Sequence, residues 1–345
     1  MNRVCIVGAG AIGGLIGARL GLDAAPGTIE FSALARGATL QALQRDGLRL
    51  IDAAHPDGQC VALRAADRGD ELGEQDLVVV AVKAPALPAV ASQVAAMLHD
   101  RTAVLVAMNG VPWWFFDHAS GPCAGLHLAS VDAGDVVRSG IPTRHVIGCV
   151  VHASAVGVAP AVVRHVRGDG LIIGEPAGAS TPRTRSVAER LERAGFAVTV
   201  SPHIQRDIWF KLWGNMTMNP LSALTLATCD RLLDDPLVRA FASAVMAEAQ
   251  AIGAHFGCDI DQTPDDRHAL TRKLGAFKTS MLQDLEAGRA LELDALVGVV
   301  REIGAHLGLA TPNIDALFGL TRVLGQSKGL YPGAGEPGAP VVPPG

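Results

Sequence analysis

The first two hundred residues alternate short apolar runs with segments in which apolar residues recur at helical spacing. The apolar runs are predicted strands, at residues 3–7, 28–35, 59–64, 77–82, 103–108, 147–153, 161–166, 170–174 and 197–201. The segments 14–20, 84–98 and 183–194 are predicted helices. Strands that alternate with helices favour a parallel sheet with helices on both faces. The pattern therefore predicts an α/β domain built on a doubly wound, Rossmann-type sheet.

The pattern changes after residue 202. From residue 204 to about residue 327 the apolar positions recur at helical spacing, which predicts an all-α C-terminal domain. The last residues are dominated by Pro and Gly and are predicted to be disordered. We therefore expect an α/β domain over residues 1–202, a helical domain over 203–327 and a tail over 328–345.

A glycine-rich segment joins the first predicted strand to the first predicted helix. It has the spacing G-x-G-x-x-G and consists of Gly8, Ala9, Gly10, Ala11, Ile12 and Gly13. In this context Gly8 permits a tight turn, Gly10 lets the backbone approach a pyrophosphate, and Gly13 lets helix and strand pack closely. The helix N-terminus attracts phosphate. The segment predicts a dinucleotide site, with a chance glycine cluster or a signal peptide as the alternative.

Three polar residues follow predicted strands at their carboxyl ends, where ligands of such sheets bind: Arg36, Lys83 and Asn109. Arg36 stands where an NAD enzyme usually has an acid for the ribose hydroxyl, and Glu30, at the other end of the strand, is poorly placed for that role. An arginine can pair with a 2′-phosphate, so the sequence favours NADP over NAD. The alternatives are an exposed loop cation at Arg36 and strand-end capping at the other two positions.

A polar stripe interrupts the apolar segment 208–220. Lys211, Asn215 and Asn219 are four residues apart, and on a helix each such step turns by only about 40°, so they share one face. A cation and two amides are costly to bury without partners. The stripe therefore indicates a polar floor for a small, oxygen-rich molecule. Trp209 and Trp213 lie roughly 160–200° around the helix from Lys211 and are expected to anchor it in the core.

A second polar group lies between residues 278 and 294. A predicted helix that contains Ser280 ends at Gly288, which places Glu292 in the first turn of the next helix. From there its carboxylate can turn back towards Ser280. The alternative is an ordinary pair of surface helices in which Glu292 is a favourable first-turn acid, and the sequence leaves both readings open.

Composition restricts the class of protein further. The chain has 345 residues, of which 49% are hydrophobic and 18% charged, and its net charge is −5. This argues against nucleic-acid binding, and the apolar strand runs are too short to span a membrane. The six cysteines are scattered without C-x-x-C pairs, which predicts reduced thiols in the cytoplasm and neither a disulfide framework nor a metal site.

Taken together, these motifs resemble the ketopantoate reductase (2-dehydropantoate 2-reductase) family over nearly the whole length to about residue 325. The resemblance rests on the glycine motif, Lys83, Asn109-Gly110, the Lys211 stripe with Pro220, and Ser280-Met281 with Gly288-Arg289 and Glu292. It implies a Rossmann domain, a helical domain and a cleft between them. It also implies an NADP-dependent oxidoreductase acting on CH-OH, which reduces a 2-keto acid with NADPH for pantothenate and coenzyme A synthesis.

The resemblance also implies roles for individual residues. Lys211 corresponds to the general acid, and Glu292 to the acid that hydrogen-bonds near the reacting hydroxyl. Asn215, Asn219 and Ser280 correspond to substrate-binding positions, Asn109 to a residue at the nicotinamide and substrate, and Arg36 and Lys83 to cofactor contacts. The hydride chemistry belongs to the cofactor, while a lysine ammonium can stabilise the developing oxyanion and then protonate it.

The chain departs from the family pattern at three places. Cys229-Asp230 and Val297 replace expected asparagines, and the bulky segment Trp113-Trp114-Phe115-Phe116 follows Asn109-Gly110. Loss of polar contacts and gain of an aromatic wall would favour a different 2-keto acid, although core packing is the alternative for the tryptophans. A same-fold reductase of another 2-keto acid and a non-catalytic dinucleotide sensor remain as alternative functions, and a homodimer is a possible assembly.

Overall fold

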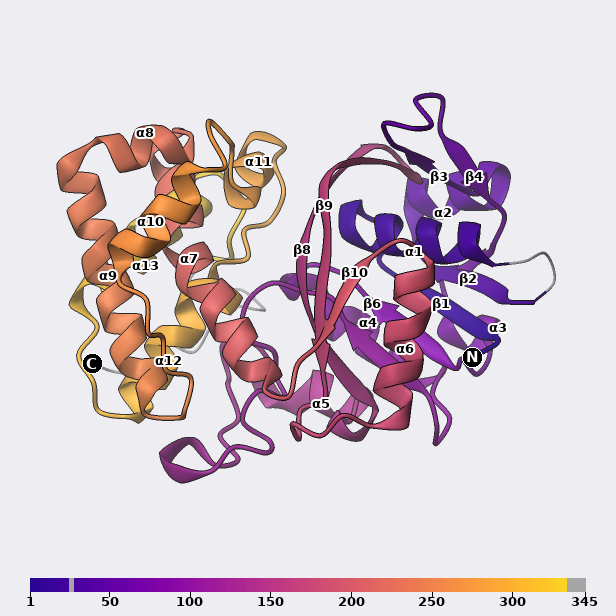
Figure 1. Ribbon diagram of the computed structural model, residues 1–345, viewed down its shortest axis with the longest axis horizontal. Coiled ribbons are helices and arrows are strands. Elements are labelled where there is room, and N and C mark those ends of the chain that lie inside the picture. Colours follow the sequence, from indigo (N-terminus) through magenta and orange to yellow (C-terminus); the bar gives the residue numbers. More distant parts are fainter. Residues whose placement is uncertain (25–27, 334–345) are drawn as a thin grey trace. The chain divides into compact units, whose positions relative to one another are not determined.

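The computed structural model describes residues 1–24 and 28–333, and the chain divides into two compact units (Figure 1). The first unit comprises Met1–Met108 and Val136–Asp207, and the second comprises Asn109–Asp135 and the chain from Ile208 onward. The boundary between them falls within helix α7 (Ile204–Thr225). From residue 334 onward, the predicted tail lies outside the described residues. The prediction of disorder was wrong for the start of this tail, because Tyr331 is 7% exposed and its hydroxyl donates a hydrogen bond to Asp294.

The first unit is built on one 10-stranded sheet in the order β4-β3-β9-β8-β7-β6-β1-β2-β5, with β10 paired to β9. Its strands are β1 (Arg3–Val7), β2 (Glu30–Leu34), β3 (Leu48–Ile51), β4 (Gln59–Val61), β5 (Arg64–Ala66), β6 (Leu77–Val80), β7 (Ala103–Val106), β8 (Val146–Ala159), β9 (Val162–Gly174) and β10 (Ala197–Val200). Its helices are α1 (Ala11–Asp23), α2 (Gly37–Asp46), α3 (Gly69–Leu72), η1 (Ala84–Ala86), α4 (Leu87–Ala95), α5 (Val136–Gly140), η4 (Thr143–His145) and α6 (Pro182–Arg193). The predicted α/β class is confirmed.

The sheet is mostly parallel, as predicted, but β8 pairs antiparallel with β9, and β3 with β4. Strands β8 and β9 form a long hairpin whose register shifts at several points, and Ala161 turns the chain with a φ of 61° (Figure 1). The predicted strands 161–166 and 170–174 are one continuous strand. From His152 onward, β8 is exposed or half-buried on both faces, so it lacks the apolar pattern that marks a strand, and β9 stabilises it by hydrogen bonds. Strand β3 was also missed.

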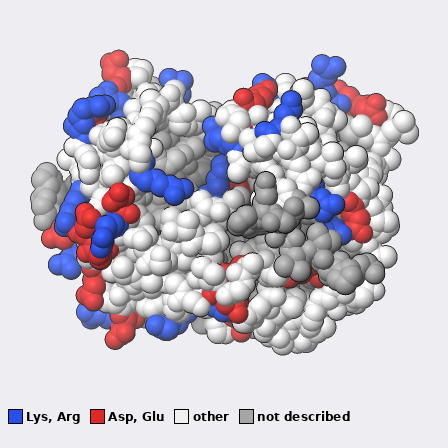
Figure 2. Space-filling model, turned by 180° about the vertical axis from the view of Figure 1, so that it is seen from behind, with Lys and Arg blue, Asp and Glu red and all other residues white. Residues whose placement is uncertain are grey.

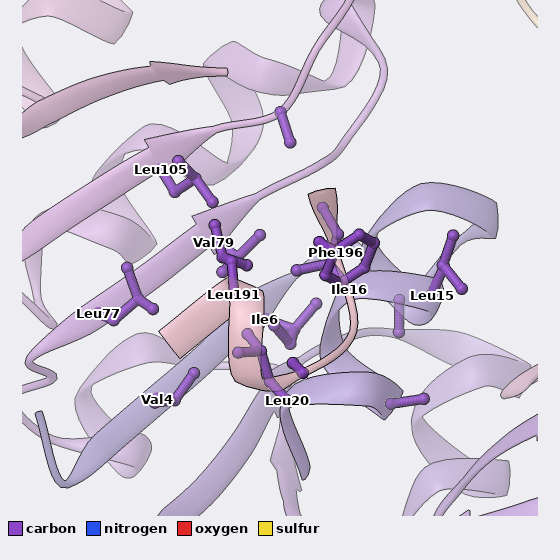
Figure 3. Packing of buried hydrophobic residues seen from close by; sticks show 14 of the residues in the cluster. Val4, Ile6, Leu15, Ile16, Leu20, Leu77, Val79, Leu105, Leu191 and Phe196 are labelled. Carbon is purple, nitrogen blue, oxygen red and sulfur yellow. The ribbon is translucent and has the colours of Figure 1, made fainter. Parts of the chain in front are cut away.

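The core of the first unit is a continuous apolar cluster between the sheet and its helices. Figure 3 shows part of it, with side chains from β1, β6, β7, α1 and α6. Leu15 and Ile16 of α1 and Leu77 of β6 are completely buried. Because full burial of one such side chain contributes roughly 1.5–3 kcal/mol, this packing fixes α1 against the carboxyl half of β1. The glycine-rich segment between them is therefore held at both ends.

The second unit is helical, as predicted for the C-terminal domain. Besides α7 it contains η2 (Gly121–Cys123), η3 (Ala133–Asp135), α8 (Cys229–Asp234), α9 (Pro236–Ala254), α10 (Pro264–Arg272), α11 (Ser280–Glu286), the π-helix η5 (Asp294–Gly298), α12 (Val299–His306) and α13 (Pro312–Ser327). No helix in the described ranges is long and apolar enough to cross a membrane. On the face shown in Figure 2, Lys and Arg are interspersed with Asp and Glu.

The segment Asn109–Asp135 packs with the helical unit, whereas the sequence placed it in the α/β domain. The rings of Phe115 and Phe116 contact Phe256 at centroid distances of 6.0 and 5.1 Å, and Phe115 also contacts Trp209. Further along, both carboxylate oxygens of Glu302 accept hydrogen bonds from backbone N–H groups of the segment. Packing of these aromatic rings therefore assigns the segment 109–135 to the helical unit. The periodicity of the strands in the sequence carries no information about such long-range contacts.

Candidate active site

The glycine-rich segment connects β1 to α1 in a conformation that requires glycine at two points. Gly8 has a φ of +93°, which favours glycine. A Cβ atom at Gly13 would lie 2.1 Å from the carbonyl oxygen of Gly8, so any side chain there would force the helix away from the strand. At Gly10 a Cβ atom would meet nothing within 4 Å. The space beside Gly10, at the N-terminus of α1, fits the approach of a pyrophosphate.

Two cations follow neighbouring strands of the same sheet. Strands β2 and β6 both pair in parallel with β1, so their carboxyl ends share an edge with the glycine-rich segment. Arg36 is exposed and immediately precedes α2, and Lys83 is half-buried and precedes η1. At the opposite end of β2, Glu30 pairs with Arg3 at 3.1 Å. The edge therefore presents N–H groups and two cations, a set suited to phosphates.

The predicted polar stripe lies on α7 in the second unit. The ammonium of Lys211 donates a hydrogen bond to Oδ1 of Asn109 at 2.9 Å, and the amide of Asn219 donates to the hydroxyl of Ser280 at 3.3 Å. Lys211 and Asn215 are half-buried, whereas Asn219 is only 5% exposed. The structure thus brings together Lys211 with Asn109, and Asn219 with Ser280, across more than sixty residues of sequence in each case.

The opposite face of α7 is anchored as predicted. Trp209 and Trp213 are each 1% exposed, and the indole N–H of Trp213 donates to the carbonyl of Met246 at 2.8 Å. The ring of Trp209 packs edge-on against Phe256. Because these large side chains are locked in the core, the stripe on the other face has little freedom to rotate.

Asn109 is positioned by its neighbours on the chain. Gly110 has a φ of +87°, and a Cβ atom there would lie 2.3 Å from the carbonyl oxygen of Ala295. The next N–H, of Val111, donates to that same carbonyl at 3.1 Å. Ala295 lies in the π-helix η5, so this helix holds the backbone that presents Asn109 to Lys211. Single π-turns of this kind recur at functional sites.

Glu292 does not lie in the first turn of a helix, as we had expected. It is half-buried and precedes the helical residues, which begin at Leu293 and continue into η5. The preceding helix α11 begins at Ser280, and the side chain of Thr279 caps it by accepting a hydrogen bond from the N–H of Leu282. The positive φ of Gly288 follows the end of α11, as expected.

Most of the residues that depart from the family pattern are buried, although Asp230 is half-buried. Cys229 and Val297 are inaccessible, and burial raises the pKa of the Cys229 thiol to about 12, so it stays protonated and unreactive. Trp113 and Trp114 are 2% and 1% exposed. Together with Phe115 and Phe116 they form a packing segment, which agrees with core packing of the tryptophans and not with an aromatic wall lining an open site.

Asp294 is a half-buried acid next to this site that no sequence pattern predicted. The hydroxyl of Tyr331 donates to Oδ1 of Asp294 at 2.7 Å, and Asp294 begins the π-helix η5. Burial raises the pKa of Asp294 to about 6, although the hydrogen bond from Tyr331 opposes that rise. The only signal in the sequence was an acid placed within the apolar run 291–300.

Comparison with known proteins defines the class. The family model for ketopantoate reductase PanE/ApbA matches residues 4–178, and the model for its C-terminal part matches residues 203–325. The chain therefore belongs to the ketopantoate reductase family of oxidoreductases. A 2-dehydropantoate 2-reductase from Mesorhizobium japonicum is 43% identical over 331 residues, covering 95% of this chain and 99% of that protein.

Solved structures agree with the fold. A candidate ketopantoate reductase from Ralstonia solanacearum MolK2 has a TM-score of 0.91 and 56% identity, covering 96% of this chain and 99% of that chain. A PanE/ApbA family ketopantoate reductase from Ralstonia eutropha JMP134 has a TM-score of 0.80 and 26% identity, covering 95% and 99%. D-mandelate dehydrogenase, solved with NADH and anilino(oxo)acetate, shares the fold at 19% identity and a TM-score of 0.80, with coverage of 95% and 100%.

Gly10 and Gly13 of the β1–α1 connection are expected to contribute to different properties, Gly10 to cofactor binding and Gly13 to stability. We expect Gly10→Ala to fold like the wild type, since its Cβ atom meets no protein atom, but to bind NADPH at least about tenfold more weakly because the methyl group occupies the pyrophosphate space. Gly13→Ala should destabilise the first unit, because the helix must shift. Thermal unfolding and NADPH titration of both variants check this, and unchanged NADPH affinity in Gly10→Ala would contradict the dinucleotide assignment.

Asp294 should make the stability of the second unit depend on pH. Its folded-state pKa is raised, so its contribution is fully present below the ordinary value of 3.8 and is lost as the pH rises through about 6. The loss is about 3 kcal/mol in the free energy of unfolding. Asp294→Asn should abolish this part of the dependence of the free energy of unfolding on pH. Tyr331→Phe should extend the dependence to higher pH, because it removes the hydrogen bond that lowers the pKa of Asp294.

Denaturant unfolding followed by tryptophan fluorescence measures this directly, because all four tryptophans lie in the second unit: Trp113, Trp114, Trp209 and Trp213. Asp315→Asn, which removes an exposed acid of the same unit, serves as the control. An identical slope between pH 4 and pH 7 in the wild type and in Asp294→Asn would show that Asp294 is not the group responsible.

Proposed function

We propose that this chain reduces a 2-keto acid with NADPH, and that the reaction is the conversion of 2-dehydropantoate to pantoate in pantothenate and coenzyme A synthesis. The observation that carries the proposal is the hydrogen bond from the Lys211 ammonium to Asn109, which holds a proton donor on the polar face of α7. The Mesorhizobium japonicum relative, named 2-dehydropantoate 2-reductase, supports the choice of substrate. Its 99% coverage means that the likeness spans that whole protein.

Lys211 acts as the general acid. Reduction of a ketone leaves negative charge on its oxygen, and an ammonium both stabilises that charge and supplies the proton. Asn109 is suited to orient this group, because its carbonyl accepts one of the ammonium N–H bonds without neutralising the charge. Glu292 hydrogen-bonds the hydroxyl that forms.

The amides and the hydroxyl orient the substrate. Asn219 and Ser280 already hydrogen-bond each other, so both side chains are preorganised. Asn215 lies between Lys211 and Asn219 on the same face of α7. Neutral donors of this kind bind carboxylate and hydroxyl oxygens and leave Lys211 as the acid.

The first unit binds the dinucleotide. When bound, the reduced nicotinamide supplies the hydride. The backbone from Gly8 to Gly13 and the N-terminus of α1 bind the pyrophosphate, and Arg36 and Lys83 bind further phosphate oxygens, including the 2′-phosphate that distinguishes NADPH from NADH. We place the enzyme in the cytoplasm, since its six cysteines are scattered along the chain without C-x-x-C pairs, a pattern typical of reduced thiols.

Lys211→Ala should lower kcat for reduction of 2-dehydropantoate by roughly a hundredfold to ten-thousandfold, the usual contribution of a general acid. Binding of NADPH should change little, because the residues proposed to bind its phosphates, from Gly8 to Gly13 with Arg36 and Lys83, belong to the first unit. The measurement is steady-state oxidation of NADPH at 340 nm. Lys273→Ala, an exposed lysine of the same unit, should keep full activity.

The wild type assayed with a panel of 2-keto acids tests the substrate itself. Oxidation of NADPH by other 2-keto acids but not by 2-dehydropantoate would exclude the pantothenate reaction while keeping the reductase. Turnover unchanged in Lys211→Ala would exclude the mechanism, and dinucleotide binding without turnover on any substrate would indicate a sensor.

Arg36→Ala should raise KM for NADPH by about tenfold or more, the effect of losing a charge-assisted contact to phosphate, and leave KM for NADH nearly unchanged. Arg45, an exposed arginine of α2 that pairs with Asp46, offers the matched control Arg45→Ala. Equal effects on both cofactors would show that Arg36 does not read the 2′-phosphate.

A further inference from the structure

An arginine of the second unit lies against the helix that carries the polar stripe. Arg267, on α10, places its guanidinium carbon 4.9 Å from the centroid of the Phe210 ring. A Cβ atom at Gly214, one turn further along α7, would lie 2.7 Å from Nε and Nη2 of Arg267. A glycine inside a helix costs about 1 kcal/mol relative to alanine. The position of Arg267 explains why residue 214 is a glycine, because the side chain of any other residue would clash with the guanidinium.

Arg267 has no counter-ion among residues 1–24 and 28–333. Within these ranges no carboxylate pairs with it, and its Nε atom is buried without a hydrogen-bond partner. Burial alone lowers its pKa from the ordinary value. Three other partly exposed arginines do pair with a carboxylate: Arg19 with Asp169, Arg183 with Glu175, and Arg301 with Asp315. A desolvated charge without a partner is costly, which suggests that an anion completes the site.

Arg267 borders the same partly open face of α7 as the proposed general acid. Phe210, Lys211 and Asn215 are half-buried, whereas the residues between them on the helix are buried. At 100° per residue, the row of Phe210 and Gly214 lies directly beside the row of Lys211 and Asn215. The guanidinium that covers Gly214 and the ammonium of Lys211 therefore flank one strip of helix surface, about one turn apart along the axis.

We propose that Arg267 binds the carboxylate of the 2-keto acid whose keto oxygen meets Lys211. In a 2-keto acid the carboxylate and the ketone are on adjacent carbons, so two cations on one strip of helix can bind both groups at once. A guanidinium matches a carboxylate with two parallel hydrogen bonds, and the ring of Phe210 holds its plane. This inference rests on the proposed function and adds that the enzyme selects ketones with a neighbouring carboxylate.

The kinetic test compares Arg267→Met and Arg267→Lys with Arg272→Met, a change on the same helix to an arginine that pairs with Asp234. Loss of a hydrogen-bonded charge pair of this kind should raise KM for the 2-keto acid by roughly ten- to a hundredfold in Arg267→Met. KM for NADPH should not change, and kcat should change much less than KM. Arg267→Lys should recover part of the loss, and Arg272→Met should behave as the wild type.

A second variant tests the same contact without removing the charge. In Gly214→Ala the added methyl group displaces the guanidinium, so we expect the same rise in KM for the 2-keto acid. Tryptophan fluorescence and thermal unfolding show whether each variant has kept the fold of the second unit. A rise in KM for NADPH, with KM for the 2-keto acid unchanged, would assign Arg267 to a cofactor phosphate and overturn the proposal.

Binding of oxamate separates this inference from the proposed function. Oxamate carries a carboxylate beside a carbonyl group but is not reduced, so calorimetric titration of the protein with NADPH bound reports the carboxylate site without turnover. The wild type should bind oxamate, and Arg267→Met should bind it at least about tenfold more weakly. Equal binding by both would overturn the assignment of Arg267 even in an active reductase. The opposite result is also informative. If oxamate binding depends on Arg267 but the protein reduces no 2-keto acid, the proposed function is overturned and the assignment of Arg267 is kept.

Discussion

The hydrogen bond between Lys211 and Asn109 is the interaction on which the candidate site depends. An ammonium on an otherwise apolar helix is tolerated because a carbonyl oxygen meets it at 2.9 Å. That oxygen is in place because Gly110 and Val111 fit against the carbonyl of Ala295 in the π-helix η5. The part-buried pair of Asp294 and Tyr331 lies at the start of the same helix. The position of the Lys211 ammonium thus depends on backbone contacts between Gly110 and Val111 and a residue far along the chain from them, Ala295.

The two units present different chemistry for the same reaction. The first offers backbone N–H groups and cations at the carboxyl edge of parallel strands, which suits phosphates whatever the substrate. The second offers amides, a hydroxyl and an ammonium on helices, and the tryptophans behind α7 keep this face rigid. On the proposed function, cofactor binding depends mainly on backbone geometry, whereas recognition of the substrate depends on individual side chains.

The sequence predicted what local patterns encode. The glycine-rich connection, the stripe on α7 and the burial of Trp209 and Trp213 follow from spacing alone, and the structure contains all three. It did not predict the outer half of β8, because an exposed strand shows no apolar alternation. It also did not predict the placement of 109–135 in the helical unit, which depends on ring packing with Phe256. Asp294 and Arg267 were missed since their partners lie on other elements.

The proposed Arg267 site differs in kind from the other polar groups of the candidate site. Cys229 and Val297, which stand where amides were expected, are buried and have no charge to offer a ligand. The guanidinium over Gly214 is a charged group in partly desolvated surroundings, where an ion pair is stronger than in water. Neutral amides discriminate among hydroxyl and carbonyl groups by geometry, whereas a desolvated cation discriminates by charge. A site that holds both kinds of group would select the carboxylate by its charge and the rest of the substrate by the geometry of its hydrogen bonds.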